Sequence, residues 1–313
     1  MILYNRIFVI TLFLSSTVII VNYLFIRFYL STNPSLKSSE VFKKAMQTVC
    51  KDNQEQEYLI TKVDLESLST AQLRDLFYKF ITKPSDGVCP NKQRIGGRFE
   101  NIKCYDGHRY VCLNQNLLSD IEKNKCLVYS FGIKDDWTFE QGLRDIGCKV
   151  LAFDPSVDLP RELDTNIFFE KIGLGNWVRT THTYRNTQTL SSIIRNHGHT
   201  HTNISYLKLD IEGSELDGLL EWFESGALSN VQQIAIEYHM EAKWIKSTPQ
   251  WQYKTFLKGL QKIYVEDNFK LVSYDFNLCW LSSYDQNIYQ KYHGYPAYSE
   301  ILLMRPSKDS FCE

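Results

Sequence analysis

The stretch 206–215 places two carboxylates where a strand gives way to a helix. Residues 206–209 (YLKL) form a mostly apolar run typical of a buried strand, and Asp210 and Glu212 follow it. Leucines at helical spacing after Ser214 predict a helix that begins with a capping box formed by Ser214 and Asp217. Ligands of open α/β sheets bind beyond the carboxyl ends of strands, so both acids could orient a reactant or remove a proton. For Glu212, simple capping of the helix is the alternative.

A second candidate group is the strand end Glu237-Tyr238-His239. Histidine titrates near neutral pH, so His239 is a candidate general base beside Asp210 and Glu212. A structural hydrogen bond is the alternative role for this histidine. These three residues, Asp210, Glu212 and His239, are the predicted catalytic set.

Metal binding is the next chemistry to consider. Asp210 and Glu212 offer oxygen ligands, but no third ligand is evident in the sequence, and we predict no metal. A run of three histidines, His197, His199 and His201, lies in a polar turn. That spacing defines no ligand geometry, so we expect exposed loop histidines there.

A glycine and an acid mark two earlier strand ends. The first predicted strand ends in Ser130-Phe131-Gly132, and the second ends in Asp154, about 20 residues after the glycine. In dinucleotide-type sites an acid at about this separation holds ribose hydroxyls. The pair therefore predicts a ligand that contains adenosine.

Strand and helix patterns alternate from residue 125 onward. Strands are predicted at 126–131, 149–153, 167–172, 206–209, 233–238, 270–274 and 301–304, and helices at 138–146, 190–195 and 251–265. This alternation predicts a doubly wound α/β fold with a mainly parallel sheet.

Three segments carry a resemblance to a known family: LVYSFGIKDDWTFE (127–140), AFDP (152–155) and LKLDIEGSE (207–215). They resemble the FkbM-type S-adenosylmethionine-dependent methyltransferases, in particular the animal branch called methyltransferase-like protein 24. The resemblance implies a seven-stranded, Rossmann-like methyltransferase sheet with an antiparallel last strand. It also implies an S-adenosyl-L-methionine site, with these contacts expected: Ser130, Phe131, Gly132, Asp154, Gly173 and Asp210.

The resemblance further implies O-methylation of a glycan or a small hydroxylated acceptor. Two alternatives stay open. A membrane-anchored glycosyltransferase would use Asp210 and Glu212 to bind a metal and a sugar nucleotide. A catalytically inactive methyltransferase fold could act as a binding module, because the first loop is poor in glycine.

The N-terminus predicts a membrane anchor. Residues 7–25 are almost entirely apolar, close to the roughly 20 residues that span a bilayer, and no small-residue cleavage site follows. We therefore expect an uncleaved, single-pass signal anchor. The glycosylation sequon at Asn203 favours a body in the secretory-pathway lumen of the Golgi or ER. The net charge of −1 argues against a nucleic-acid partner.

Four domains are expected along the chain: the anchor at 1–30, a stem at 31–62, an N-terminal lobe of helix and loops at 63–124, and the methyltransferase domain at 125–313. The turn signal at Asp106-Gly107 predicts a hairpin in the lobe. A lumenal body permits disulfides, and we expect them among three cysteines of the lobe: Cys89, Cys104 and Cys112. Cys126 and Cys148 begin strands and are expected to be buried thiols.

Overall fold

The computed structural model describes residues 54, 57–58, 60–85, 87–101, 104–175, 179–181, 184–239, 250–277, 279 and 298–306. The chain divides into two compact units, Met1–Val49 and Cys50–Glu313, and every described residue lies in the second. The predicted anchor at 7–25 therefore lies outside the described residues. Among the residues that are described, no helix has the length and apolar character needed to cross a bilayer.

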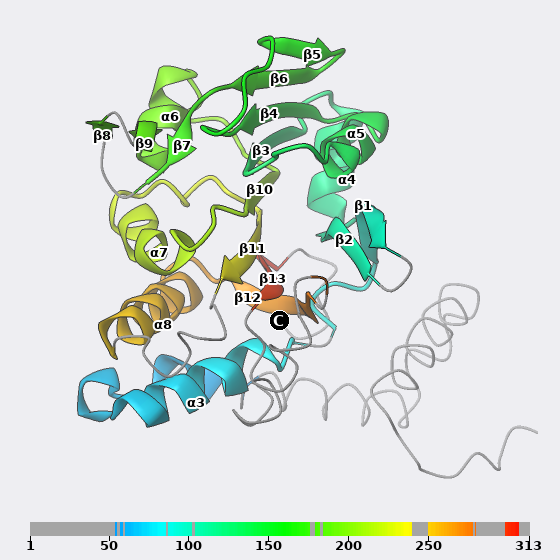
Figure 1. The fold of residues 1–313 in the computed structure, drawn as a ribbon. Helices are drawn as coiled ribbons and strands as arrows, with labels where there is room; N and C mark the ends of the chain where they lie inside the picture. Colours follow the sequence, from blue (N-terminus) through cyan, green and yellow to red (C-terminus); the bar gives the residue numbers. More distant parts are fainter. Residues whose placement is uncertain are drawn as a thin grey trace, which may run out of the picture. The chain divides into compact units, whose positions relative to one another are not determined.

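An eight-stranded mixed sheet forms the centre of the second unit (Figure 1). Its order is β12 (Lys270–Phe276), β13 (Tyr298–Met304), β11 (Gln233–His239), β10 (Tyr206–Leu209), β3 (Leu127–Phe131), β4 (Lys149–Phe153), β6 (Ile167–Glu170) and β5 (Glu162–Asp164). β13 runs antiparallel to both its neighbours, and β5 runs antiparallel to β6. The predicted α/β sheet with an antiparallel last strand is confirmed, and β5 is an additional edge strand.

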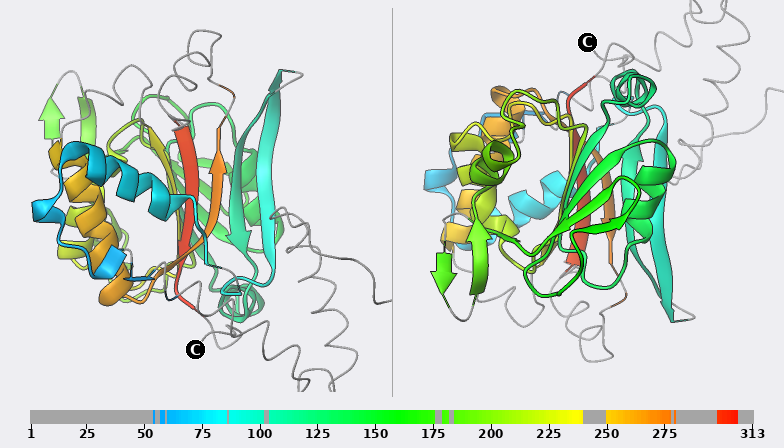
Figure 2. Two further views of the ribbon diagram at one scale, coloured as in Figure 1. Left: turned by 90° about the horizontal axis from the view of Figure 1, so that it is seen from below. Right: turned by 90° about the horizontal axis from the view of Figure 1, so that it is seen from above.

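Helices cover one face of this sheet, and a mixed layer covers the other (Figure 2). The helical layer contains α3 (Thr70–Ile81), α6 (Leu190–Asn196), α7 (Glu215–Glu224) and α8 (Gln250–Val265). Leu207, Leu209 and Ile236 belong to the core on this side. The opposite core includes Tyr206 and Ala235, because side chains alternate between the faces of a strand. α4 (Gln115–Glu122), α5 (Thr138–Asp145) and a hairpin lie on that second face.

One predicted helix start, the capping box at Ser214, differs from the structure. α3 begins at a capping box, in which the Ser69 hydroxyl accepts from the Gln72 amide and the Gln72 side chain accepts from the Ser69 amide. The capping box predicted at Ser214 is wrong, since that side chain makes no capping hydrogen bond. The Glu215 carboxylate instead accepts from the amides of Ile211 and Gly213, one turn earlier.

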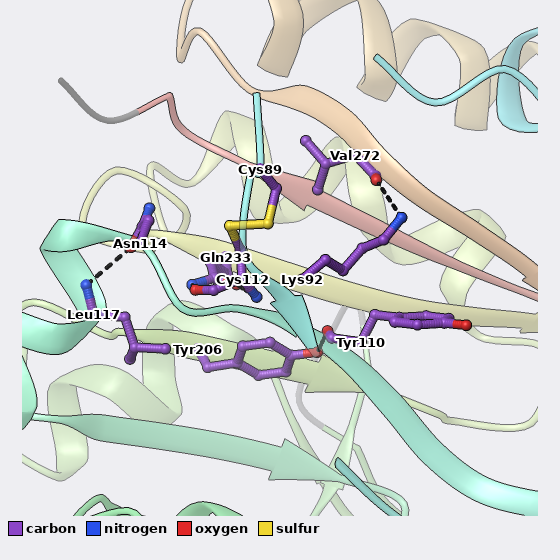
Figure 3. Close-up of a disulfide and its surroundings, with 9 residues drawn as sticks. All are labelled: Cys89, Lys92, Tyr110, Cys112, Asn114, Leu117, Tyr206, Gln233 and Val272. Atoms are coloured by element: carbon purple, nitrogen blue, oxygen red, sulfur yellow. Dashed lines mark hydrogen bonds between the residues drawn. A yellow bond between two sulfur atoms is a disulfide. The ribbon is translucent and has the colours of Figure 1, made fainter. Parts of the chain in front are cut away.

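The N-terminal lobe contributes a long two-stranded hairpin, β1 (Lys92–Asn101) and β2 (Cys104–Cys112). The predicted turn at Asp106-Gly107 lies within β2, so the hairpin is correct but its turn was misplaced. Hydrogen bonds with three sheet residues help to attach the hairpin to the face of the sheet (Figure 3). Gln233 hydrogen-bonds both the amide and the carbonyl of Cys112, the Tyr206 hydroxyl donates to the Tyr110 carbonyl, and Lys92 Nζ donates to the Val272 carbonyl.

Two disulfides are described in full. Cys89–Cys112 ties the segment before β1 to the end of β2, as the grouping of lobe cysteines predicted (Figure 3). Cys126–Cys148 joins the starts of the adjacent strands β3 and β4. The expectation that Cys126 and Cys148 are thiols is therefore wrong. Both begin neighbouring parallel strands, which brings their Cα atoms to 4.6 Å, within the range a disulfide can bridge.

A small second sheet follows β6 in the chain. It contains β7 (Gly173–Leu174), β9 (Tyr184–Gln188) and β8 (Arg179–Thr181) in that order. The sequence did not predict β8 and β9, because polar residues dominate both strands and leave no apolar run.

Candidate functional site

Four acidic side chains lie in a row across neighbouring strands of the main sheet. Asp210 directly follows β10, whose last residue, Leu209, pairs with Ile236 of β11, the residue before Glu237. Glu237 pairs with Glu300 on β13, which in turn pairs with Asp275 on β12. Like charges directly opposite one another on a sheet destabilise it unless they are neutralised. The row therefore requires positive partners.

Arg109 of β2 supplies the main positive partner. Its guanidinium contacts Asp210 at 2.8 Å, Glu237 at 2.5 Å and Glu300 at 2.8 Å. At the far end of the row, His108 Nε2 lies 3.3 Å from Asp275. Arg109 is 1% exposed, so a cation from the hairpin is buried against three carboxylates of the sheet. Asp210 and Glu237 were candidates from their strand-end positions in the sequence, whereas no sequence pattern marked Arg109 or Glu300.

Burial changes the protonation of this group. It raises the pKa of Glu237 to about 7, even though Arg109 acts in the opposite direction. Burial likewise raises the pKa of Glu300 well above the ordinary carboxyl range. For Arg109, burial alone would lower the pKa, but the charges of Glu300, Glu237 and Asp210 outweigh it and raise the value. The guanidinium is therefore a permanent charge, whereas protons can reside on the two buried glutamates.

His239, at the end of β11, lies among three carboxylates. Its Nδ1 is 3.2 Å from Glu215 Oε1, and its Nε2 is 3.7 Å from both Asp210 Oδ1 and Glu212 Oε2. Burial alone would lower its pKa, but the hydrogen bond and charge of Glu215, with Glu237 and Asp210, raise it to about 9. The expectation of a histidine that titrates near neutrality is therefore wrong for this structure. At pH 7 the ring is mainly imidazolium, which cannot accept a proton.

Glu215 is the residue that organises this corner. It is 0% exposed, and it accepts the amides of Ile211 at 2.6 Å and Gly213 at 2.9 Å. Between those two amides the backbone of Glu212 takes a positive φ of 54°, and its side chain is 80% exposed. Sequence patterns assigned no role to Glu215. Two signals were available: it is the last residue of the segment 207–215 that carries the family resemblance, and it is an acid at the first position of a helix, a common pattern.

Gly132, Asp154 and Asp210 meet at one rim of the sheet, as predicted. The Gly132 amide donates to the Phe153 carbonyl, next to Asp154, and a Cβ on Gly132 would lie 1.6 Å from the Asp210 carbonyl oxygen. With a φ of +77°, this position suits only glycine. The close approach that requires glycine is therefore to the strand end at Asp210.

Asp154 is engaged with its own chain. One carboxylate oxygen accepts the amides of Ile133 and Lys134, and the other accepts the amide and hydroxyl of Ser156. The residue is 4% exposed. Its evident role is to hold the loop after β3 against the end of β4.

The other predicted cofactor contacts are in different surroundings. Ser130 is buried and donates to Glu140, which lies 3.6 Å from Lys208. Phe131 is buried on the helical face and stacks on Phe153, with ring centroids 4.6 Å apart. Gly173 is buried, and a Cβ there would lie 3.1 Å from Pro155. The side chains of Ser130 and Phe131 thus point into the protein, and only their backbone could reach a ligand at the rim.

Two groups of side chains in the described part of the chain could hold a metal ion. Asp210, Glu215 and His239 form one, and Asp106, Glu237 and Glu300 form the other, each with ligand atoms within 4.8 Å of one another. The first group shares Asp210 with the pair considered from the sequence, but it contains Glu215 and His239 and not Glu212. The second group already holds the Arg109 guanidinium through Glu237 and Glu300.

Two surface features differ from expectation. His201 is exposed as predicted, but His197 packs against Phe153, and His199 Nδ1 lies 2.8 Å from the Tyr129 hydroxyl. In the sequon, the Asn203 amide donates to Asp120 and accepts from Gln232. A glycan on Asn203 would replace one hydrogen of the Nδ2 group that donates to Asp120.

Two curated relatives, each named "Probable methyltransferase-like protein 24", are 31% identical over 140 residues, or 42% of this chain. They come from Homo sapiens and Rattus norvegicus, and the match spans 37% and 38% of their own lengths.

Two solved structures give weaker similarities. A geranyl diphosphate methyltransferase with GPP and sinefungin has a TM-score of 0.34 at 9% identity, covering 61% of this chain and 77% of the other. A putative tRNA (m1A22) methyltransferase from Streptococcus pneumoniae has a TM-score of 0.25 at 11% identity, covering 63% and 71%. At these scores the two structures add no argument of their own.

The decisive match is to a family model described as "Methyltransferase domain", which covers residues 44–286, more than half of the chain. The chain therefore belongs to this methyltransferase-domain family, in agreement with the resemblance drawn from its sequence motifs.

Proposed function

We propose that this protein is an S-adenosylmethionine-dependent methyltransferase that methylates a hydroxyl oxygen of a glycan or a small hydroxylated acceptor. The observation that carries the proposal is the meeting of Gly132, Asp154 and Asp210 at the carboxyl rim of β3, β4 and β10. Open α/β sheets bind their ligands at this rim. Membership of the methyltransferase-domain family supports the same reaction class.

The residues at the rim fit S-adenosylmethionine, but the role of Asp154 differs from the one expected. Asp154 was expected to hold ribose hydroxyls, but its oxygens already accept four hydrogen bonds from the protein. We assign it instead to the loop at Ile133 and Lys134, whose backbone would face the cofactor. Asp210 keeps 24% of its side-chain surface exposed and remains available at the rim.

When bound, S-adenosylmethionine would supply an electrophilic methyl group. The chain must then orient the acceptor hydroxyl and take up its proton. Asp210 is the first candidate, because one oxygen is held by Arg109 at 2.8 Å while the other faces the neighbouring histidine. Glu212, which is mostly exposed, is suited to contact the acceptor. His239, mainly cationic at pH 7, would orient Asp210 through charge.

The proposed location is the lumen of the secretory pathway, with the N-terminal segment as a membrane anchor. Two disulfides in the described residues support an oxidising compartment, because disulfides are rare in the cytosol. Protease protection of the body in intact microsomes would test this location, and digestion without detergent would contradict it.

A binding module with the same fold is the second candidate. The satisfied carboxylate of Asp154 favours it, since a dedicated ribose ligand would be expected to keep an oxygen available.

Calorimetric titration of the full-length chain with S-adenosylhomocysteine separates the two candidates. A methyltransferase should bind it saturably at one site, and Asp154→Asn should weaken binding through disorder of the loop. Exposed Glu122→Gln is the matched control. Absence of binding to a correctly folded, disulfide-bonded chain would favour the binding module.

A further inference from the structure

We propose that Lys208, supported by Glu140 and Ser130, positions the loop after β3 for binding of S-adenosylmethionine. Lys208 is 4% exposed, so it acts through the loop and is not itself a contact of the cofactor. The cofactor in this statement rests on the proposed function, whereas the hold of Lys208 on the loop does not.

The three residues meet on the face of the sheet that lies opposite the helical layer. Lys208 is in β10 between Leu207 and Leu209, which belong to the core under the helical layer. Because side chains alternate along a strand, Lys208 faces the other side. Ser130 is its register partner on β3, and Glu140 reaches the same place from α5. All three side chains are buried.

The ammonium group of Lys208 is directed at the loop more closely than at the acid. Lys208 Nζ donates to the Gly132 carbonyl at 2.8 Å but lies 3.6 Å from Glu140 Oε1, which is too far for a hydrogen bond. That oxygen of Glu140 instead accepts the Ser130 hydroxyl at 2.6 Å. Ser130 therefore holds the carboxylate where its charge neutralises Nζ without drawing Nζ away from the carbonyl.

The loop is thus held through both kinds of backbone group. The Gly132 amide donates to the Phe153 carbonyl, and the next two amides donate to one oxygen of Asp154. Lys208 binds the carbonyl of the same glycine. A carboxylate that accepts from the amides and an ammonium that donates to the carbonyl together fix the conformation of the loop at the rim.

Stability alone does not account for this buried charge pair. Replacing a buried ion pair with apolar side chains is often neutral or stabilising. Within the described part of the chain, Glu140 Oε2 has no hydrogen-bond partner, which adds a further cost of burial. A charged donor, however, makes a stronger hydrogen bond to a carbonyl than a neutral donor does. The ammonium therefore serves to hold the Gly132 carbonyl.

Two variants separate this role from simple neutralisation of Glu140. Lys208→Met leaves a buried, unpaired carboxylate, so it should lower stability as well as affinity. The double variant Lys208→Met/Glu140→Gln removes both charges and should recover most of the lost stability in urea denaturation. In calorimetric titration of the full-length chain, the double variant should still bind S-adenosylhomocysteine about 10–100-fold more weakly, the scale of one charge-assisted hydrogen bond. Exposed Lys123→Met is the matched control and should bind like the parent chain.

Amide hydrogen exchange of the unliganded chain measures the loop directly. In the double variant, a peptide that covers residues 131–136 should exchange faster than in the parent chain, whereas a peptide from β12 should exchange at the parent rate. A local change of this kind is not expected if Lys208 only neutralises Glu140, because the recovered stability would then restore exchange everywhere.

Either of two results would overturn the proposal: parent-like affinity in the folded double variant, or parent-like exchange of its loop. Failure of the proposed function looks different, because the parent chain itself would then bind no S-adenosylhomocysteine. Loop exchange would still decide the role of Lys208 in that case, since it is measured without cofactor.

Discussion

Arg109 illustrates how one buried charge can hold several strands together. Its guanidinium contacts acids that follow or lie on three neighbouring strands, and it comes from a hairpin outside the main sheet. Breaking a buried ion pair is costly because the remaining partners keep their unfavourable burial. Loss of Arg109 should therefore lower the free energy of unfolding more than loss of an exposed ion pair does.

Replacement of Arg109 by methionine should lower the free energy of unfolding by about 3–5 kcal/mol, the usual loss when a buried pair is broken. Adding Glu300→Gln should recover part of the loss, because it removes one uncompensated acid. Urea denaturation of the single and double variants measures both effects. A loss below about 1 kcal/mol would mean that Arg109 does not neutralise the acidic row, since that is the range for exposed pairs.

Gly132 and Gly226 permit a matched comparison of two glycines. Both have positive φ, but a Cβ on Gly226 meets nothing within 4 Å, whereas one on Gly132 meets the Asp210 carbonyl. Gly226→Ala should cost about 1–2 kcal/mol from backbone conformation alone. Gly132→Ala should cost about 1–3 kcal/mol more, the penalty of forcing an extra carbon into a packed site. Equal losses of stability in thermal denaturation would refute the close approach.

Asp154 should make stability depend on pH. Burial would raise its pKa, but hydrogen bonds from Ser156, Lys134 and Ile133 outweigh burial and lower it. A folded pKa below the unfolded value of about 3.9 means that stabilisation is complete above that pH and is lost as pH falls through the folded pKa. Asp154→Asn should therefore cost about 1–3 kcal/mol at pH 7. The difference from the parent chain should shrink below about pH 4, and a constant difference from pH 7 to pH 2 would contradict the argument.

At the scale of residues, the candidates that the sequence could provide are those whose residue type and position at a strand end both indicate a function. Asp210, Glu212 and Gly132 are such residues. Arg109 and Glu300 could not be predicted, because their contact depends on how the hairpin docks, 191 residues apart in the chain. The protonation of His239 was wrong for a related reason: the acids that raise its pKa are brought together only by folding.

At the scale of elements, apolar runs were the reliable signal. The strands at 149–153 and 206–209 have the predicted bounds, and the helix predicted at 138–146 ends one residue earlier. The hairpin strands combine charged residues with three glycines, at 96, 97 and 107, so no periodic pattern marked their bounds.

The two disulfides should stabilise the protein to a similar extent. Their cysteines are 23 and 22 residues apart, and loop length governs how strongly a crosslink restricts the unfolded chain. Removing either pair by double alanine substitution should lower the free energy of unfolding by about 3 kcal/mol. Urea denaturation of the two variants provides the comparison. A large loss for Cys89–Cys112 alone would show that attachment of the hairpin matters more than loop length.

At the scale of the whole molecule, local sequence patterns did not predict the strand order, and only the family resemblance implied it. Periodicity identified the strands, but the placement of β13 between β11 and β12 depends on long-range pairing that no local pattern encodes. The sequence also did not predict how the lobe attaches to the sheet. This attachment rests on the ion pairs of Arg109 and on hydrogen bonds such as those of Gln233 with Cys112 and of Tyr206 with Tyr110.

That attachment limits how the protein can be divided or recombined. A fragment starting at β3 would retain the acids of the sheet but lose their counter-ion and one crosslink, both of which lie upstream. A chimera joined at that boundary would therefore take its acids from one protein and its cation from another. Any exchange between relatives that preserves folding should carry the hairpin and the sheet as one inherited block.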